Sequence, residues 1–572
     1  MKNRLLLLFL VLAISLCSPL LSFAADLDIL DKQRYAPPEP KSLPSLKIVD
    51  EPGKPRFDQS VRFTLAGLRI EGGTVFTEQA LLAPYGKLNG TTVSFDQISS
   101  IAEEMTKKYR DAGYLLSQVV MPAQEVDAAN AVIRLVAIEG YISDIEYKAE
   151  RNTNKREPDA QLRKQFEWYF SGRKEKLLAM RPLRHSDFER EMLLIQDLPG
   201  ITVSTRFRPG SERGASILEI TLERKWMDLT TSYGNTGTKT SGPHMFSATV
   251  NVNSLPVIGS RTTVSYTQAE HSQEYASVFV EQSQQFSNGL RVYTSYAYSE
   301  SPKAATELAK LFDHETKSNT VNVGFSYPIL RSRDMNLYWG MNYEHRNSYA
   351  DLLDERFTTD RLRNISMNLN FDFSDELGGV TQIIPSVTQG LNIFKATDKS
   401  FESASPLANA KFVKGNVYVS RNQPLPNGFS IFAAGEGQIS DTVLYSYNKY
   451  SLGGSQFGRG YNPGVIEGDN ALAASIEPRW TYHFTDHLGI QPYIFVDWGI
   501  VWSSRKLADT RDEENLASAG IGFRLWGSSW GQDVGKKYLP DFSINCFLGK
   551  PLKAAGDESA TERLVVQAIL FF

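Results

Sequence analysis

One pattern limits the fold of this chain more than any other, an alternation of apolar and polar residues that recurs through residues 226–572. Phe246, Ala248, Val250 and Val252 alternate with Ser247, Thr249, Asn251 and Asn253. Ile365, Met367, Leu369, Phe371 and Phe373 alternate in the same way with Ser366, Asn368, Asn370 and Asp372. Successive side chains of a strand point to opposite faces, so the pattern predicts strands with one apolar and one polar face.

Two folds share this alternation, a soluble β-sandwich and a membrane β-barrel whose apolar face meets lipid and whose polar face lines a wet lumen. The start of the chain gives partial evidence on which of these two folds applies. Lys2 and Arg4 precede an apolar run from 5 to 16, and Ala24 and Ala25 follow it. This arrangement is typical of a secretory signal peptide, and we assign it residues 1–25. The apolar run is too short for a spanning helix, which needs about 20 residues. The chain is therefore expected to be exported.

The end of the chain favours the barrel. Its last apolar face is formed by Leu564, Val566, Ala568, Leu570 and Phe572. An apolar face that finishes in a terminal Phe resembles the signal by which barrel proteins are recognised for outer-membrane insertion. This implies outer-membrane lipid and the barrel-assembly machinery as partners. At about 10 residues for each strand, residues 226–572 leave room for roughly sixteen strands, although spacing alone would also permit fourteen or eighteen.

Two segments precede the expected barrel. Residues 26–60 are rich in proline, with Pro37, Pro38, Pro40, Pro44, Pro52 and Pro55, and should form an extended linker. A short plug helix could form there only from Leu27 to Tyr35.

Residues 61–141 then read as a small α+β domain. Ser94 and Gln97 form a capping box for a long helix, whose apolar face carries Ile98, Ile101, Met105 and Tyr109. Gly113 supplies its stop.

Residues 142–225 repeat this organisation. Ser186 and Glu189 form a second predicted capping box, and the helix should end at Pro199 and Gly200. The ranges 201–209 and 215–222 read as its paired strands. A duplication explains both halves more simply than two unrelated domains do. Each copy is expected to hold a three-stranded sheet with an edge open to an extended peptide, and we expect the first copy to use it.

A glycine-rich loop sits late in the expected barrel. Gly458, Arg459, Gly460 and Tyr461 follow a Leu-Gly-Gly turn at 452–454. Glycine permits tight turns and close approach of neighbouring chain, so the Arg suits the tip of a hairpin that folds back on itself. Further on, Phe495, Asp497 and Gly499 share one face of a strand-like run. If that face looks into the barrel, Arg459 should meet Asp497 there.

Together these motifs resemble the two-partner secretion transporters (TpsB, the ShlB/FhaC/HecB-like hemolysin secretion and activation family) of the outer-membrane assembly and secretion superfamily. The resemblance also rests on Gly437-Gln438-Ile439-Ser440, Gly468-Asp469 and Ser475-Ile476-Glu477. One departure is Gly458, which stands where the family usually has Val or Ile. The resemblance implies two periplasmic POTRA domains at 61–141 and 142–225. It also implies a transmembrane antiparallel β-barrel of about 16 strands at 226–572, with an inward-folded loop near 452–470.

Its functional implication is an outer-membrane transporter in a Gram-negative bacterium. The POTRA domains would recognise a secreted partner exoprotein of the hemolysin or haemagglutinin (TpsA) type, and the barrel would pass it unfolded to the cell surface without nucleotide hydrolysis. Two alternatives stay open. An outer-membrane assembly factor, or insertase, shares the loop motif but usually carries more POTRA domains. A passive porin needs neither paired periplasmic modules nor an inward-docked Arg loop.

No motif of the sequence supports an enzyme. There is no nucleotide-binding Gly-Lys-Ser/Thr loop, so no catalytic site, enzyme activity or cofactor is expected. His483 and His487 have the spacing of a helical metal pair, but their neighbours predict a hairpin turn, and no metal is expected. The net charge of −4 argues against nucleic acid as a partner.

Overall fold

The computed structural model describes residues 47–48, 61–149, 160–238, 241–302, 314–504, 513–528, 541–556 and 561–572. The predicted signal peptide, the possible plug helix at 27–35 and most of the predicted linker lie outside these residues. The described chain forms two compact units, one within residues 40–225 and one within 226–572. No helix in the described parts is long and apolar enough to span a membrane.

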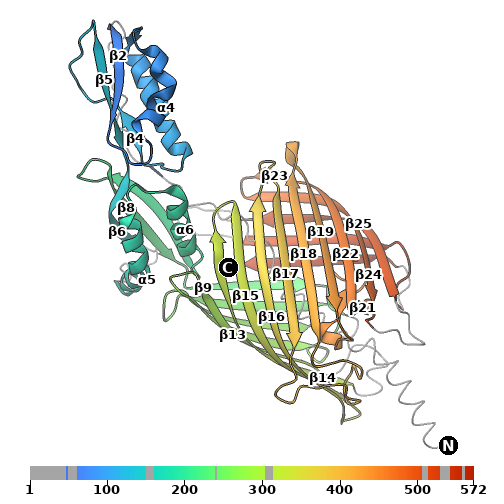
Figure 1. The fold of residues 1–572 in the computed structure, drawn as a ribbon. Coiled ribbons are helices and arrows are strands. Elements are labelled where there is room, and N and C mark those ends of the chain that lie inside the picture. The colour runs from blue at the N-terminus through green and yellow to red at the C-terminus, as the bar shows by residue number, and fades with distance from the viewer. Residues whose placement is uncertain are drawn as a thin grey trace, which may run out of the picture. The chain divides into compact units, whose positions relative to one another are not determined.

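The first module packs a four-stranded sheet against helices (Figure 1). Its elements are β2 (Arg62–Glu71), α3 (Glu78–Leu82), η2 (Ala83–Leu88), β3 (Thr92–Ser94), α4 (Phe95–Asp111), β4 (Gln118–Val120) and β5 (Ala131–Ile138). The sheet order is β3-β2-β5-β4, so it has one strand more than expected because the short β3 pairs with β2. The capping box of Ser94 and Gln97 is present, and Gly113 follows the helix with φ +89°. The predicted apolar face of α4 is buried in the core.

The second module repeats the arrangement with β6 (Tyr141–Ala149), α5 (Ala160–Ala179), α6 (His185–Gln196), β7 (Ile201–Pro209) and β8 (Ala215–Arg224). A two-residue strand from the linker, β1 (Lys47–Ile48), pairs in parallel with β7 and gives the order β1-β7-β8-β6. The predicted capping box is wrong here, because α6 begins at His185 and Ser186 already lies inside its first turn. The His185 N–H instead donates to the carbonyl of Gly113 in the first module, at 2.8 Å.

Residues 227–571 form a closed antiparallel barrel of sixteen strands (Figure 1). Its first half is β9 (Met227–Gly234), β10 (Met245–Asn253), β11 (Ser260–Ala269), β12 (Ala276–Gln285), β13 (Arg291–Ser301), β14 (Glu315–Arg331), β15 (Met335–Leu352) and β16 (Glu355–Ser374). Its second half is β17 (Val380–Gly390), β18 (Val413–Pro424), β19 (Phe429–Ser440), β22 (Asn470–Trp480), β24 (Leu488–Trp502), β25 (Glu513–Gly527), β26 (Asp541–Pro551) and β27 (Arg563–Phe571). A short β23 (Tyr482–Thr485) extends β22 along the same neighbour, β24. A 3₁₀ turn, η3 (Pro426–Gly428), joins β18 to β19.

The two faces of the wall differ in exposure. On β24, Ile494 and Val496 are 56% and 50% exposed, whereas their neighbours Phe495 and Asp497 are 1% and 0% exposed. One face is therefore apolar and open, and the other is covered from inside the barrel. The wall closes where β27 pairs with β9. On β27, the predicted face of Leu564, Val566, Ala568 and Leu570 alternates with the buried Val565.

Candidate functional site

The connection between β19 and β22, residues 441–469, folds into the barrel. It contains the 3₁₀ turn η4 (Ser446–Asn448) and a small hairpin of β20 (Tyr450–Leu452) and β21 (Ile466–Gly468). Its apolar side chains pack on Ala471 and Ala473 of β22, Val501 of β24 and Leu516 of β25. We call residues 457–461 of this loop the tip.

Arg459 of the tip is 5% exposed and lies against the wall. Its Nε and its own backbone N–H both donate to Oδ2 of Asp497 at 2.9 Å, and its Nη2 donates to Oδ1 at 2.8 Å. Nη2 also donates to the Ser475 hydroxyl at 2.9 Å. The guanidinium carbon lies 3.7 Å from the ring centroid of Phe495, within cation–π range. The predicted contact between Arg459 and Asp497 is confirmed.

A second carboxylate completes this cluster. Oε2 of Glu477 accepts from Arg459 at 2.5 Å, while its Oε1 lies 2.7 Å from both Arg479 and Arg524. Glu477 is 2% exposed, so one buried carboxylate is shared by three guanidinium groups. Charge-assisted bonds of this kind are about twice as strong as neutral ones. Glu477 was not among the predicted site residues, yet Ser475, Glu477 and Arg479 alternate on β22, which was the signal for an inward polar face.

The glycines of the motifs lie where neighbouring groups approach the backbone closely. Gly458 has φ +82°, and a Cβ on it would lie 2.8 Å from Leu516, which explains why this chain has glycine before the Arg. A Cβ on Gly460 would lie 2.7 Å from the backbone of Lys550 and Pro551. Gly499 allows a similarly close approach on the wall, because a Cβ there would lie 2.6 Å from Leu452 of the loop.

Tyr461 holds the other side of the tip against the residues around it. Its side chain is 1% exposed, and its single O–H hydrogen is shared between the carbonyls of Ala517, at 2.9 Å from the hydroxyl oxygen, and Lys553, at 2.7 Å. Its carbonyl accepts from Nη1 of Arg563, on the last strand, at 2.9 Å. All four residues of the tip motif and all three of the wall motif therefore meet in one place. The terminal residues predicted for insertion lie on β27 and one residue beyond its end, at Phe572, whose side chain is 52% exposed.

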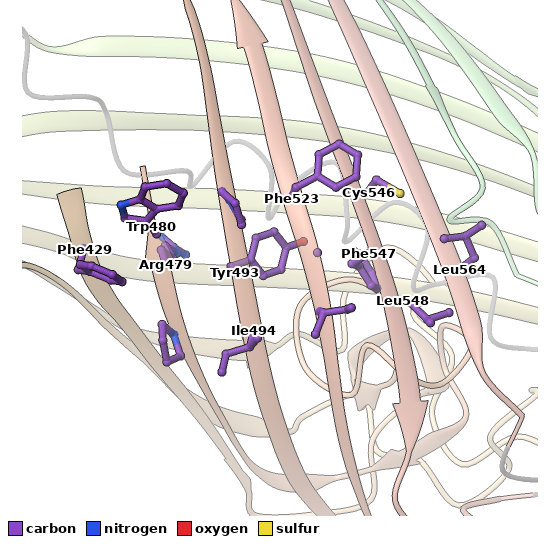
Figure 2. Close-up of a pocket in the computed structure, with 14 residues that line it drawn as sticks. Phe429, Arg479, Trp480, Tyr493, Ile494, Phe523, Cys546, Phe547, Leu548 and Leu564 are labelled. Carbon is purple, nitrogen blue, oxygen red and sulfur yellow. The ribbon is translucent and has the colours of Figure 1, made fainter. Parts of the chain in front are cut away.

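The outer side of the same wall carries a hollow of about 590 Å³, lined by residues of β19, β22 and β24 to β27 (Figure 2). Ile494 and Ile521 are cross-strand partners on its surface, and they are 56% and 61% exposed. Phe523 and Leu548 also line it. Asp497 lies on the opposite face of β24, whereas Arg479, which pairs with Glu477 in the buried cluster, is also among the residues that line the hollow. Its apolar lining suits contact with lipid rather than with a polar ligand.

The family model for "Haemolysin secretion/activation protein ShlB/FhaC/HecB" matches residues 214–525, and the model for "POTRA domain, ShlB-type" matches residues 63–140. The chain belongs to the ShlB/FhaC/HecB family. It is an outer-membrane β-barrel of the TpsB type with periplasmic POTRA modules. The residues that precede β9 are periplasmic, so the loop at 441–469 enters from the surface side, because hairpin connections alternate between the two ends of a barrel.

Curated relatives agree over most of their length. "Outer membrane transporter CdiB" of Dickeya dadantii (strain 3937) is 24% identical over 494 residues, which cover 83% of this chain and 81% of the relative. "Heme/hemopexin transporter protein HuxB" of Haemophilus influenzae (strain 86-028NP) is 23% identical over 556 residues, covering 91% and 90%. Among solved structures, CdiB from Escherichia coli matches with a TM-score of 0.68 at 19% identity, over 95% of this chain and 97% of that one.

Proposed function

We propose that this transporter passes one partner exoprotein, unfolded, from the periplasm to the cell surface, without nucleotide hydrolysis. The observation that carries the proposal is the loop locked inside the lumen by Arg459, Asp497 and Glu477. A simple diffusion pore gains nothing from a buried ion cluster that fixes a surface loop in its path. A transporter for a large client needs such a device, because its lumen must be closed at rest and must open for a chain.

The periplasmic modules would capture an extended client segment by adding it to a sheet edge. The first module offers little free edge. The backbone N–H and C=O of Val119, on its edge strand β4, are both bonded to the Thr106 hydroxyl, at 2.9 Å and 3.3 Å. On β2, the N–H of Ile70 donates to Glu78 at 3.1 Å. These contacts weigh against our expectation that the first module provides the edge.

The geometry of the second module supports β7 as that edge. The Lys225 N–H donates to Gly200 and the Gly210 N–H donates to Ala215, so even-numbered residues of β7 bond to β8. The odd-numbered residues therefore turn their backbone groups to the other side. Among the described residues, β1 lies opposite only two of the nine residues of β7, in register with Arg206 and Phe207. This side of β7 therefore already pairs with one extended segment, β1, in the parallel direction.

Deletion of the gene in its host tests the function. Loss of one large protein from the culture medium, with the outer-membrane barrels at normal abundance, is the expected result. A general loss of outer-membrane barrels would instead identify an assembly factor. An unchanged medium, together with altered uptake of small solutes, would identify a porin. The protein lost from the medium is then the exoprotein for the experiments below.

A further inference from the structure

The outer face of the barrel changes from apolar to basic near the surface end of β16. This strand runs from the turn at 353–354, on the surface side, towards the periplasm. Met367 and Leu369 are 50% and 39% exposed, as side chains that face lipid should be. Arg361 and Arg363 lie on the same face of the strand, because strand side chains alternate with a period of two. The lipid-facing side of β16 therefore ends in two arginines.

Arg363 is a buried cation without an acidic partner. It is 3% exposed, and its Nη1 donates to the carbonyls of Arg346 and Leu362, both at 2.7 Å. Its Nη2 donates to Oδ1 of Asn347 at 2.9 Å and to the carbonyl of Phe394 at 3.2 Å. All four acceptors are uncharged, and Nε has no hydrogen-bond partner within the described residues. A buried charge in such surroundings is costly unless an anion pairs with it.

The surface loop between β17 and β18 covers this arginine with a turn at 393–396. The loop follows the edge of β16, since the N–H of Leu391 donates to the carbonyl of Arg363 at 2.7 Å. The ring of Phe394 lies 6.4 Å, between centroids, from the ring of His345, which is the cross-strand partner of Arg363. Cross-strand partners share a face of the sheet. The turn thus lies over the outer face of the wall and not over the lumen.

This turn exposes apolar and basic side chains together. Ile393 and Phe394 are 42% and 68% exposed, and the neighbouring Lys395 is exposed as well. Phe394 and Lys395 have φ values of +49° and +58°, a left-handed conformation that residues with a Cβ adopt at a cost. Lys395 and Arg361 form no ion pair with a described residue. The turn therefore holds a mixed apolar and cationic surface next to the buried guanidinium.

Acidic side chains nearby are too few to neutralise these cations. The ranges 361–363 and 391–402 contain four Lys and Arg residues but only two acidic ones, Asp398 and Glu402. Asp398 already accepts from the backbone N–H of Ala410 at 3.1 Å and from Asn392 at 3.3 Å. The surface end of this face consequently carries an excess of positive charge directly above its apolar part.

We propose that this place binds a phosphorylated, acylated glycolipid of the outer leaflet, of the lipid A class. Its phosphate pairs with Arg361, Arg363 and Lys395, and its acyl chains cover Ile393 and Phe394. Charge-assisted bonds to a phosphate supply the anion that Arg363 lacks. Position favours a lipid over an acidic segment of the exoprotein, because the cations continue the lipid-facing side of the wall. The inference does not depend on what the barrel transports.

Binding of lipid to the full-length protein in detergent, followed by native mass spectrometry, tests the site. The probes are bis-phosphorylated lipid A, lipid A with both phosphates removed, and phosphatidylglycerol. We expect the wild type to bind the bis-phosphorylated lipid about ten-fold more tightly than either other probe. Equal affinity for phosphatidylglycerol would overturn the choice of a glycolipid. Equal affinity for the phosphate-free lipid would overturn the phosphate contact.

Substitutions at exposed positions locate the site without disturbing the wall. Lys395→Gln and Phe394→Ser should each weaken binding of the bis-phosphorylated lipid about three- to ten-fold, and Arg363→Gln should weaken it further. Heat-modifiable migration on gels checks that each barrel is folded. Arg356→Gln is the matched control, because Arg356 belongs to the same strand but pairs with Asp351. Affinities of the Lys395 and Phe394 variants that equal the affinity of this control would overturn the proposal.

Contact of the turn with the membrane is measured separately, in bilayers that contain a nitroxide-labelled lipid. In a Cys546→Ser background, a fluorophore at Ile393→Cys should be quenched by a nitroxide near the top of the acyl chain. A fluorophore at Leu353→Cys, at the far end of the β15–β16 hairpin, should not be quenched, although Leu353 is 60% exposed. Absence of quenching at position 393 would overturn the membrane contact. Loss of secretion in Lys395→Gln with unchanged lipid binding would identify the exoprotein as the occupant and would also overturn the proposal.

Discussion

Arg459 holds both carboxylate oxygens of Asp497, with 2.9 Å from Nε to Oδ2 and 2.8 Å from Nη2 to Oδ1. This two-pronged geometry fixes the direction of the side chain as well as its distance. Since Asp497 belongs to the wall and Arg459 to a loop that enters from the surface, the pair sets the position of the whole tip. The proposed transport mechanism depends on this position.

The fit of the tip against the wall can be tested without substituting a charged residue. Gly460→Ala places a Cβ 2.7 Å from the backbone of Lys550 and Pro551, which cannot move aside as a side chain can. We expect the tip to lift, at a cost of about 1 to 3 kcal/mol, and secretion to fall while barrel abundance is kept. Gly435→Ala on β19 is the control, because the nearest atom to its Cβ lies at 3.5 Å. Equal secretion by both variants would contradict the steric argument.

The edge strand β7 yields a second prediction. Thr205→Pro removes a backbone donor from the open side of β7 and should reduce secretion of the exoprotein. Thr205→Val keeps that donor and the side-chain shape, and the Thr205 hydroxyl has no hydrogen-bond partner among the described residues, so secretion should be normal. Pulse-labelled secretion at matched protein abundance measures both. Normal secretion by the proline variant would remove β7 from the mechanism.

The first module contains a pH-sensitive contact. Burial favours the neutral form of Glu139, but the amides of Val75 and Thr74 and the hydroxyls of Thr74 and Tyr109 bond to its carboxylate, and its pKa lies below the ordinary value of 4.5. A lowered pKa in the folded state means that the carboxylate stabilises the module above about pH 4.5. This contribution is lost as the pH falls through the folded pKa.

We therefore expect Glu139→Gln to increase hydrogen exchange in residues 72–77 at neutral pH. Loss of bonds to a charged acceptor corresponds to about 1 to 3 kcal/mol, less where water reaches the group. The difference between variant and wild type should shrink as the pH falls through the lowered pKa of Glu139, because both side chains are then neutral. Mass spectrometry of the exchanged peptides measures it, and a difference that stays constant with pH would show that the carboxylate charge is not the cause.

The end of the chain makes a separate prediction about assembly. The backbone N–H of Phe572 donates to Leu229 on β9 at 2.9 Å, and its side chain is 52% exposed. We propose that this side chain completes the recognition signal, and we therefore expect deletion of Phe572 to lower the amount of protein in the outer membrane. Secretion for each inserted molecule should stay normal. Unchanged abundance and unchanged heat-modifiable migration on gels would refute this role.

Features encoded by neighbouring residues could be predicted from the sequence. The strand alternation predicted strands with one apolar and one polar face, the two ends of the chain favoured a barrel, and Ser94 with Gln97 identified the start of α4. Arg459 and Asp497 could be paired because each carries a recognisable local motif. Glu477 could have been added, since it alternates with Ser475 and Arg479 on one strand.

Features decided by distant partners could not be predicted in this way. The predicted N-cap at Ser186 is absent because α6 begins one residue earlier, at His185. The backbone N–H of His185 bonds to Gly113, which is far away in the sequence. The parallel pairing of β1 with β7 depends on two residues in a linker whose composition predicts only an extended chain. The stacking of Arg346 on Tyr447 joins a wall strand to a surface loop, and neither position carries a motif.

The most direct test of the account is the amount of exoprotein that Arg459→Ala releases at wild-type abundance in the outer membrane. Removing one partner of a buried pair costs about 3 to 5 kcal/mol, and a hydrated lumen lowers this value. We predict a folded, heat-modifiable barrel that secretes at least ten-fold less exoprotein. Arg459→Lys should recover only part of the loss, since lysine cannot hold both oxygens of Asp497. Secretion by Arg459→Ala at the wild-type level would contradict the central claim that the locked tip is required for transport.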